Sequence, residues 1–193
     1  MTYQQEALLL AKKSILEHWW DDFLSTYTLK NPELMEKKSC FVTLKSFWTK
    51  LRWCIGSLTS TNDLYIDIIH NAKAAAFQDT RFDSLEYDDI KDLKLFIEIT
   101  ILSPMEEKKF YNMKEVLNYL EKNKPWLVIK LDNHQATFLP SVWNELSSAE
   151  EFLTHLIYKT WLHPNMFSKR FQDVEFFIYT GEEFGKSWED IKL

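Results

Sequence analysis

The feature that most constrains this chain is its shortage of glycine: three glycines in 193 residues. Average usage, about 7%, would give roughly 13 in a chain of this length. Turns and helix ends normally use glycine where the backbone dihedral φ is positive. A fold that mixes helices, strands and tight turns is therefore unexpected from this composition. The same chain contains eight tryptophans, and the positions of these bulky residues bear on the shortage.

Length and charge narrow the class of protein. A chain of 193 residues fits one domain, and we expect residues 1–193 to form a single domain with two sub-lobes that share a cleft. Two cysteines, Cys40 and Cys54, without a secretory leader or an apolar run of about 18 residues predict a soluble, cytoplasmic protein. The net charge is −6, with both signs interspersed, which argues against a nucleic-acid binder.

The hydrophobic pattern of the first half predicts two helices and three strands. Apolar residues at helical spacing favour a helix over 3–18, and a second helix begins after a cap at Asn62 or Asp63 and buries its alanines. Alternation of apolar and polar residues favours strands. The predicted strands are 40–46 and 51–58, joined as a hairpin by a turn at 47–50, and 94–102.

The second half continues without a regular alternation of strands and helices. We expect a helix over 113–123, strands over 126–131 and 136–140, and a last strand over 174–180. Ser148 and Glu151 match an S-x-x-E capping box that opens a helix to about Thr160, and Pro140 closes the strand before it. Because strands and helices do not follow a βαβ order, the fold class is α+β.

The ordered segments resemble a known family. FVTLKS, LRWCIG, NAKAAAFQDTRF, LKLFIEITILSP, ATFLPSVWNEL and EEFLTHLIYKTWL occur in the order and at about the spacing of the AMMECR family, also called protein A of the AmmeMemoRadiSam system. The resemblance covers Tyr3 to Phe177. It implies two unequal lobes, with mostly antiparallel or mixed sheet packed against helices and the LRGCIG segment near a groove between the lobes. It also implies a Memo-like protein and a radical SAM protein as partners, and it names no settled activity.

Several tryptophans stand where the family carries glycine. These positions are Trp48, Trp53, Trp126 and Trp161. Trp19, Trp20 and Trp161 also follow predicted helices at the C′ position, where glycine is expected. One hypothesis is that UGA codons specifying glycine have been read as tryptophan; the other is ordinary divergence or an A+T-rich genome. The codons themselves would decide between them.

The candidate site centres on Cys54. Residues two apart on a strand share a face, so we expect Arg52 beside Cys54, where a guanidinium would lower the thiol pKa. The alternative is a buried structural cysteine, and we expect no bond to Cys40. Asp79 and Arg81 either line a cleft or form an ion pair with each other. His134, which we place in a loop, could face the cleft.

Other motifs are missing from the sequence. No phosphate-binding loop, dinucleotide fingerprint, G-x-S-x-G elbow or zinc spacing occurs, and we expect no cofactor and no metal. Three functional hypotheses remain. The first is an accessory protein that binds a small molecule or modified substrate at an Arg52/Cys54 cleft. The second is a thiol enzyme with Cys54 as nucleophile and Arg52 or His134 tuning it, and the third is an RNA-binding or regulatory module.

Overall fold

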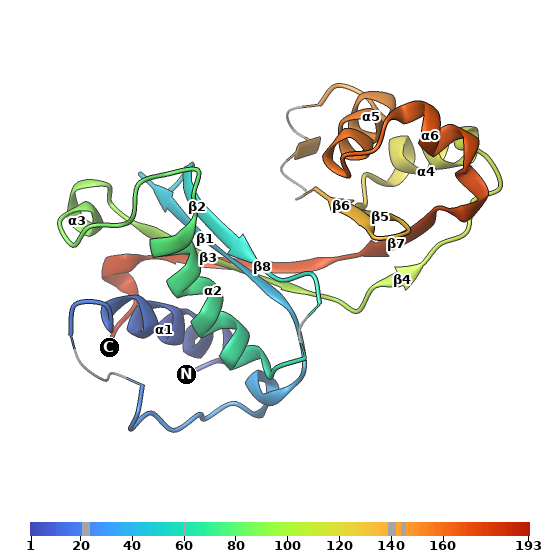
Figure 1. Cartoon of the computed structure of the whole chain (residues 1–193). Helices are drawn as coiled ribbons and strands as arrows, with labels where there is room; N and C mark the ends of the chain where they lie inside the picture. Colours follow the sequence, from blue (N-terminus) through green and yellow to red (C-terminus); the bar gives the residue numbers. More distant parts are fainter. Residues whose placement is uncertain (21–23, 60, 139–141, 144–145) are drawn as a thin grey trace. The chain divides into compact units, whose positions relative to one another are not determined.

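A computed structural model describes residues 1–20, 24–59, 61–138, 142–143 and 146–193. The chain forms two compact units. Unit 1 comprises Met1–Ser103 together with Gly181–Leu193, and unit 2 comprises Pro104–Thr180. Each unit pairs helices with an antiparallel sheet (Figure 1), so the α+β prediction is confirmed. No helix in the described part of the chain is long and apolar enough to cross a membrane.

Unit 1 is built on a four-stranded sheet with the order β2-β1-β3-β8. Two long helices, α1 and α2, cover one face of this sheet (Figure 1). A hairpin joins β1 to β2, and the turn between them falls where the sequence predicts it. The elements are α1 (Tyr3–Leu16), β1 (Cys40–Ser46), β2 (Lys50–Gly56), α2 (Leu64–Gln78), α3 (Asp89–Asp92), β3 (Phe96–Leu102) and β8 (Gly181–Ser187), with short 3-10 turns at Pro32–Met35 and Trp188–Asp190.

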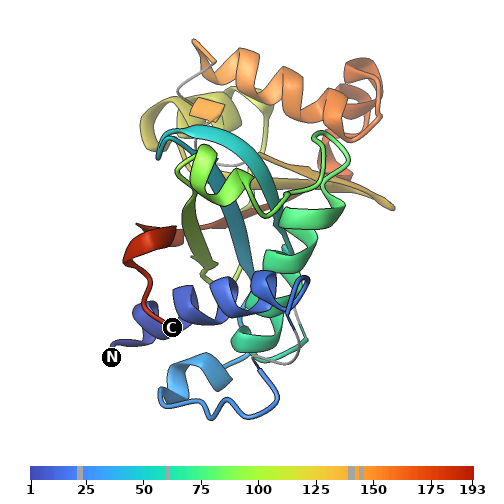
Figure 2. The same ribbon diagram turned by 90° about the vertical axis from the view of Figure 1, so that its left-hand side faces the viewer.

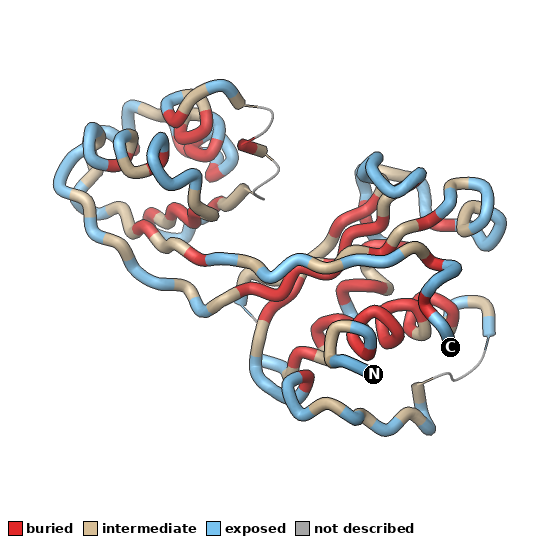
Figure 3. The backbone as a smooth tube through the Cα atoms, turned by 180° about the vertical axis from the view of Figure 1, so that it is seen from behind, coloured by how far each residue is buried: buried red, intermediate tan, exposed pale blue. Residues whose placement is uncertain are grey.

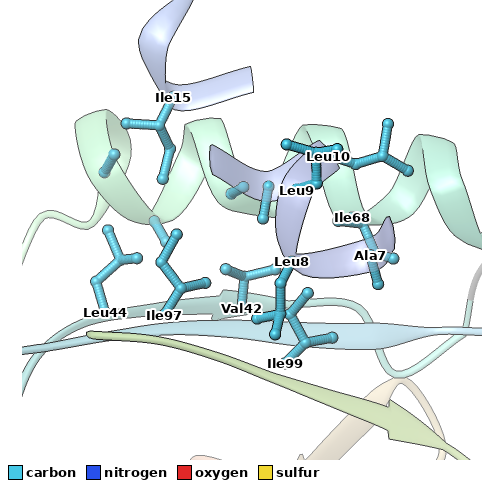
Figure 4. Packing of buried hydrophobic residues seen from close by; sticks show 14 of the residues in the cluster. Ala7, Leu8, Leu9, Leu10, Ile15, Val42, Leu44, Ile68, Ile97 and Ile99 are labelled. Carbon is cyan, nitrogen blue, oxygen red and sulfur yellow. The ribbon is translucent and has the colours of Figure 1, made fainter. Parts of the chain in front are cut away.

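The core of unit 1 follows directly from the sequence pattern. Thr2 and Gln5 form a capping box at the start of α1, which satisfies free N–H groups of the first turn. Behind this cap, α1 lies along the sheet and its apolar residues meet those of α2 and the strands (Figure 4). The buried residues of this unit, red in Figure 3, lie along its helices and its central strands. Ala72, Ala75 and Ala76 are all fully buried, so their small side chains let α2 approach the sheet closely.

Unit 2 has its own sheet, in the order β4-β7-β5-β6, and its own apolar core, to which α4 and α5 contribute (Figure 2). Ser148 accepts a hydrogen bond from Glu151 N, but the Glu151 carboxylate accepts from Ser147, so only half of the predicted capping box forms. The elements are β4 (Glu106–Glu107), α4 (Met113–Asn123), β5 (Trp126–Leu131), β6 (His134–Thr137), α5 (Ala149–Lys159), α6 (Pro164–Lys169) and β7 (Glu175–Tyr179), with a 3-10 turn at Phe171–Asp173.

Two differences from the sequence-based expectations matter for the site. The strand predicted over 136–140 begins earlier, at His134, and Pro140 lies outside the described residues. The whole of β8 is missing from those expectations, because GEEFGKS has little apolar alternation. That segment nevertheless pairs with β3 along its full length and completes the sheet of unit 1.

Positive φ occurs at six described non-glycine positions and at no glycine. Two of them, Trp48 at φ 70° and Trp161 at φ 64°, are tryptophans at positions where the resemblance leads us to expect glycine. Trp161 lies at C′ of α5, as predicted. Trp19 and Trp20 do not lie at C′ of α1, because α1 ends at Leu16 with Glu17 as its C-cap. Neither tryptophan has positive φ. The C′ prediction is therefore wrong for that pair.

Candidate functional site

The free edge of β2 is closed by an ion pair from the segment that follows α2. β2 is an edge strand, so the outward N–H and C=O of Cys54 lack a neighbouring strand. Asp79 Oδ2 accepts from Cys54 N at 2.9 Å, and Arg81 Nη2 donates to Cys54 O at 3.1 Å. The two side chains also pair directly, at 2.7 and 2.9 Å. Asp79 and Arg81 thus satisfy the backbone as a strand would, which matches the ion-pair alternative.

The geometry of this ion pair keeps the Asp79 carboxylate ionised. Hydrogen bonds from Arg81 lower the pKa of Asp79 to about 2, and the Cys54 N–H acts in the same direction. Asp79 is almost fully buried, whereas the Arg81 side chain is 56% exposed. Arg81 therefore holds Asp79 ionised while still presenting part of its guanidinium to solvent.

The Cys54 thiol is buried, and charged groups of both signs lie near it. Its Sγ accepts a hydrogen bond from Thr43 Oγ1, 3.2 Å away on β1. Burial is the main cause that raises the thiol pKa, and the hydrogen bond from Thr43 and the charge of Arg81 only partly oppose it. The expected lowering of the pKa by a neighbouring guanidinium is therefore wrong. Cys40 is more deeply buried still, and both cysteines are free.

Arg52 lies at a bulge in β2. Leu44 pairs with Trp53 and Lys45 pairs with Leu51, so Arg52 is an extra residue with no partner on β1. A bulge bends its strand and redirects the side chain of the extra residue. Because of it, the alternation that we used to place Arg52 and Cys54 on one face does not run through this part of β2.

Among the described residues, the Arg52 guanidinium contacts aromatic rings and pairs with no counter-ion. Its Cζ lies 5.3 Å from the centroid of the Trp53 ring and 5.8 Å from that of Phe82. The Arg81 Cζ lies 5.5 Å from the same Phe82 ring. Within the described residues, Arg52 Nε is a buried donor that has no acceptor. Such a group normally costs about 1–3 kcal/mol or more when left unsatisfied.

Trp53 fills the space beneath Arg52. It is among the largest fully buried side chains, and its Nε1 donates to the Asp83 carbonyl at 2.8 Å. Its ring also meets Phe82 edge to face, with centroids 6.5 Å apart. Trp53 is therefore an integral part of the unit 1 core in this chain, unlike the exposed Trp48 and Trp161.

A row of polar side chains crosses the same sheet on the face opposite α1 and α2. Thr43 pairs with Cys54 on one side and with Glu98 on the other, and Lys45 Nζ lies 2.6 Å from Glu98 Oε2. On β8, burial and the charge of Glu98 raise the pKa of Glu183. We did not single out these residues from the sequence. The sequence did carry a signal, since Thr43 and Lys45 alternate with apolar residues on one strand, and Glu98 does so on another.

The remaining predicted site residue lies in the other unit. His134 is the first residue of β6, and its Nδ1 lies 3.0 Å from the Thr160 carbonyl oxygen. The prediction of a loop is wrong there, because the chain already pairs with Leu131 at this point. The described residues contain no group of three His, Cys, Asp or Glu side chains arranged to hold a metal ion.

These features define a class of protein with two α+β units. In one unit an ion pair bonds to the backbone of an edge strand, and this strand carries a cysteine and, at a β-bulge, an arginine. The chain belongs to the AMMECR1 family, whose model matches residues 8–184. It is similar to Protein SSO0193 of Saccharolobus solfataricus, with 32% identity over 178 residues covering 86% of this chain and 78% of the relative. Protein MJ0810 of Methanocaldococcus jannaschii is 30% identical over 164 residues, covering 83% and 75%.

The fold is also similar to a solved structure. Uncharacterized protein PH0010 from Pyrococcus horikoshii superposes with a TM-score of 0.76 and 25% sequence identity. The match covers 94% of this chain and 90% of that protein. The AMMECR-like fold expected from the sequence motifs is therefore confirmed over nearly the whole chain.

Proposed function

We propose that this chain is a cytosolic accessory protein that binds a small anionic molecule or modified substrate at Arg52 and Cys54. We further propose that it acts with a Memo-like protein and a radical SAM protein. The observation that carries the binding proposal is the buried Arg52 Nε, which has no acceptor among the described residues. Arginine pairs best with planar or tetrahedral oxyanions, so a carboxylate or phosphate group would satisfy it.

The charges around the site support an anionic ligand. Asp79 is already engaged by Arg81 and by Cys54 N, and the Cys54 thiol stays protonated near neutral pH because burial raises its pKa. Of the two arginines at the site, Arg52 is therefore the one whose positive charge is not balanced by a carboxylate in the described part of the chain. Phe82, which lies near both guanidiniums, would offer an apolar surface to the rest of the ligand.

The binding proposal is tested with the purified protein and a panel of carboxylates and phosphate esters. Ligands are ranked by the rise in melting temperature, and affinities are then measured by calorimetry. Arg52→Gln should lower the affinity for a ligand of the native protein about tenfold or more, since it removes a charge-assisted contact. Lys50→Gln, which removes an exposed cation from the same strand, is the matched control. Equal affinity in the native protein and Arg52→Gln would refute the site.

The partner proposal rests on family membership and needs its own test. Tagged chain is purified from its native host, and the co-purifying proteins are identified by mass spectrometry. We expect a Memo-like and a radical SAM protein among them. Recovery of neither, in an experiment where the bait is intact and abundant, would count against that part of the proposal and leave the binding proposal standing.

The identity of residue 53 affects the site directly. We propose that the codons at positions 48, 53, 126 and 161 specify glycine in the source organism; the positive φ of Trp48 and Trp161 supports this at two of them. With glycine at 53, the space of the indole ring would open next to Arg52 and the Asp83 carbonyl. The binding panel is therefore run on Trp53→Gly as well, and sequencing the gene decides the codons.

The geometry gives less support to the other two functions. For the thiol enzyme, alkylation of Cys54 by iodoacetamide should be slow and should accelerate only above the ordinary thiol pKa of 9.0, because burial raises the pKa. The rate is measured against pH in Cys40→Ala, so that Cys54 is the one thiol left. A midpoint of the rate profile below about pH 8 would support Cys54 as a nucleophile. The net charge of −6 opposes RNA binding.

A further inference from the structure

A pocket lies in unit 1, on residues that the Arg52/Cys54 site does not use. It has a volume of about 390 Å³, within the range of about 300–1,000 Å³ typical of small-molecule sites. α1 forms its floor, and the segment from Tyr87 to Ile90 and the C-terminal residues form its sides. The lining residues are Lys12, Leu16, Trp20, Tyr87, Ile90, Trp188 and Leu193.

Among the described residues that line the pocket, Lys12 has the one charged side chain. Its Nζ donates to the Trp188 carbonyl at 2.9 Å and to the Ile191 carbonyl at 2.7 Å. An ammonium group has three N–H donors, so one donor is left over. Within the described residues, no carboxylate lies within 4 Å of this Nζ. Lys12 is nevertheless only 8% exposed, so it is a buried cation without a counter-ion.

Burial of such a cation carries a cost that a ligand could offset. Desolvation is the cause that lowers the pKa of Lys12, and none of the described acidic residues acts on it. Buried charges are normally paired, and the two carbonyls supply only partial negative charge. A full negative charge delivered by a bound molecule would complete the environment of the ammonium.

The walls of the pocket favour a flat ring on the rest of that molecule. Trp20 and Tyr87 are 43% and 50% exposed, and their rings meet at 82° with centroids 4.9 Å apart. The Trp188 ring lies 5.1 Å from Lys12 Nζ. Aromatic rings pack edge to face and offset-stacked against one another, so an incoming ring would find several faces and edges to contact.

We propose that this pocket binds an aromatic carboxylate, with the carboxylate on Lys12 Nζ and the ring between Tyr87, Trp20 and Trp188. A cationic ligand would be repelled by Lys12. A neutral aromatic would leave the ammonium without a counter-charge, and a small inorganic anion would gain nothing from the rings. The combination of one unpaired cation with aromatic walls therefore selects ligands that carry both groups.

The proposal is tested with two fluorinated aromatic probes, the anionic para-fluorobenzoate and the neutral para-fluorobenzyl alcohol. Binding to the full chain is followed by fluorine NMR line broadening. We expect the native protein to bind the benzoate about tenfold or more tightly than the alcohol, which reflects one charge-assisted contact. Lys12→Met should abolish that preference. Tyr87→Ala should weaken both probes, because it removes a wall.

Equal affinity of the native protein for the two probes would overturn the proposal, and so would a Lys12→Met variant that keeps its preference for the benzoate. Lys12 also holds the C-terminal residues through two carbonyls, so the folding of Lys12→Met is checked by circular dichroism. Where that variant does not fold, the native comparison and Tyr87→Ala decide. Undiminished benzoate binding by Tyr87→Ala would place the probe elsewhere and refute the site.

Discussion

At the scale of single residues, the glycine shortage means that bulky residues adopt backbone conformations with positive φ. The turn between β1 and β2 has Phe47 at φ 49° and Trp48 at φ 70°, and Thr49 N donates to the Ser46 carbonyl. A turn with positive φ at both central residues is of type I′, and Asn-Gly is its usual sequence. A bulky residue in the left-handed region costs roughly 1–2 kcal/mol. The chain thus carries strain at places where glycine would have none.

Replacing the strained tryptophans should stabilise the protein. Trp48→Gly and Trp161→Gly should each raise the free energy of unfolding by about 1 kcal/mol, since both residues are exposed and have positive φ. Trp126→Gly is the control, because this residue is on a strand and contacts Tyr179. It should destabilise the protein. The measurement is urea unfolding followed by circular dichroism.

Trp53→Gly should behave in the opposite way to Trp48→Gly. Its ring is fully buried and its Nε1 is satisfied, so we expect a loss of about 3–5 kcal/mol, as for other large-to-small changes in a core. A neutral or stabilising effect would show that the surrounding residues adapt to glycine at this position. Loss of stability in Trp48→Gly would contradict the strain at the turn.

Asp79 should make the stability of the protein sensitive to acid. Its folded pKa of about 2 lies below the ordinary 3.8, so its contribution is present above pH 4 and is lost as the pH falls through 2. At neutral pH, Asp79→Asn should cost about 1–2 kcal/mol, because water screens the exposed side of Arg81. Urea unfolding of both proteins between pH 7 and 2 should show their difference shrinking below pH 4. A constant difference would exclude the ionic contribution.

At the scale of elements, the sheet of unit 1 depends on a strand from the far end of the chain. β8 covers the edge of β3 with seven paired residues. Its residues are mostly polar and partly exposed, so backbone pairing and not apolar burial holds it in place. The bulge at Arg52 is likewise a feature of pairing, since it arises from how β2 aligns with β1.

The close approach of β8 to β3 should be sensitive to a single methyl group. A Cβ on Gly185 would lie 2.4 Å from Phe96 Cε1 and 2.8 Å from the Ile97 carbonyl oxygen. Gly185→Ala should therefore destabilise unit 1 by about 1–3 kcal/mol, as overpacking does elsewhere. Lys186→Ala, at the exposed neighbouring position, is the control and should be close to neutral. Equal stability of the two variants in urea unfolding would contradict the tight packing.

At the scale of the whole molecule, the two units differ in how the chain builds them. Unit 1 needs both ends of the chain, whereas unit 2 is one continuous segment, Pro104–Thr180. Unit 2 also has its own core, in which Trp143 stacks on Phe152 with ring centroids 3.8 Å apart. A continuous segment with a separate core is the usual composition of a part that folds alone.

A fragment spanning residues 104–180 should therefore fold by itself. We expect helical circular dichroism, dispersed NMR amide signals and a cooperative thermal transition. The same fragment with Phe152→Ala should lose that transition, because the fully buried ring is worth about 3–5 kcal/mol in a core. A fragment of residues 1–103, which lacks β8, should expose the edge of β3 and aggregate. An unfolded 104–180 fragment would show that unit 2 depends on the rest of the chain.

Much of the fold could be predicted from local pattern. The strand over Cys40–Ser46 and the helix over Met113–Asn123 have the predicted boundaries, because alternation and helical periodicity are encoded in neighbouring residues. The candidate site was predicted less well. Asp79 and Arg81 were identified, but Thr43 and Glu98 were not, since each becomes a neighbour of Cys54 or Lys45 only through pairing across strands.

The sequence by itself determined the types of most elements, the α+β class and the family, because these depend on short-range periodicity and on motif order. It also showed the glycine shortage and the tryptophans at positions where glycine is expected. Only the tertiary structure decided that Arg52 leaves the strand alternation, that the Cys54 thiol is buried and protonated, and that β8 completes the first sheet. Those outcomes depend on register, burial and contacts between distant residues, and no local pattern encodes them.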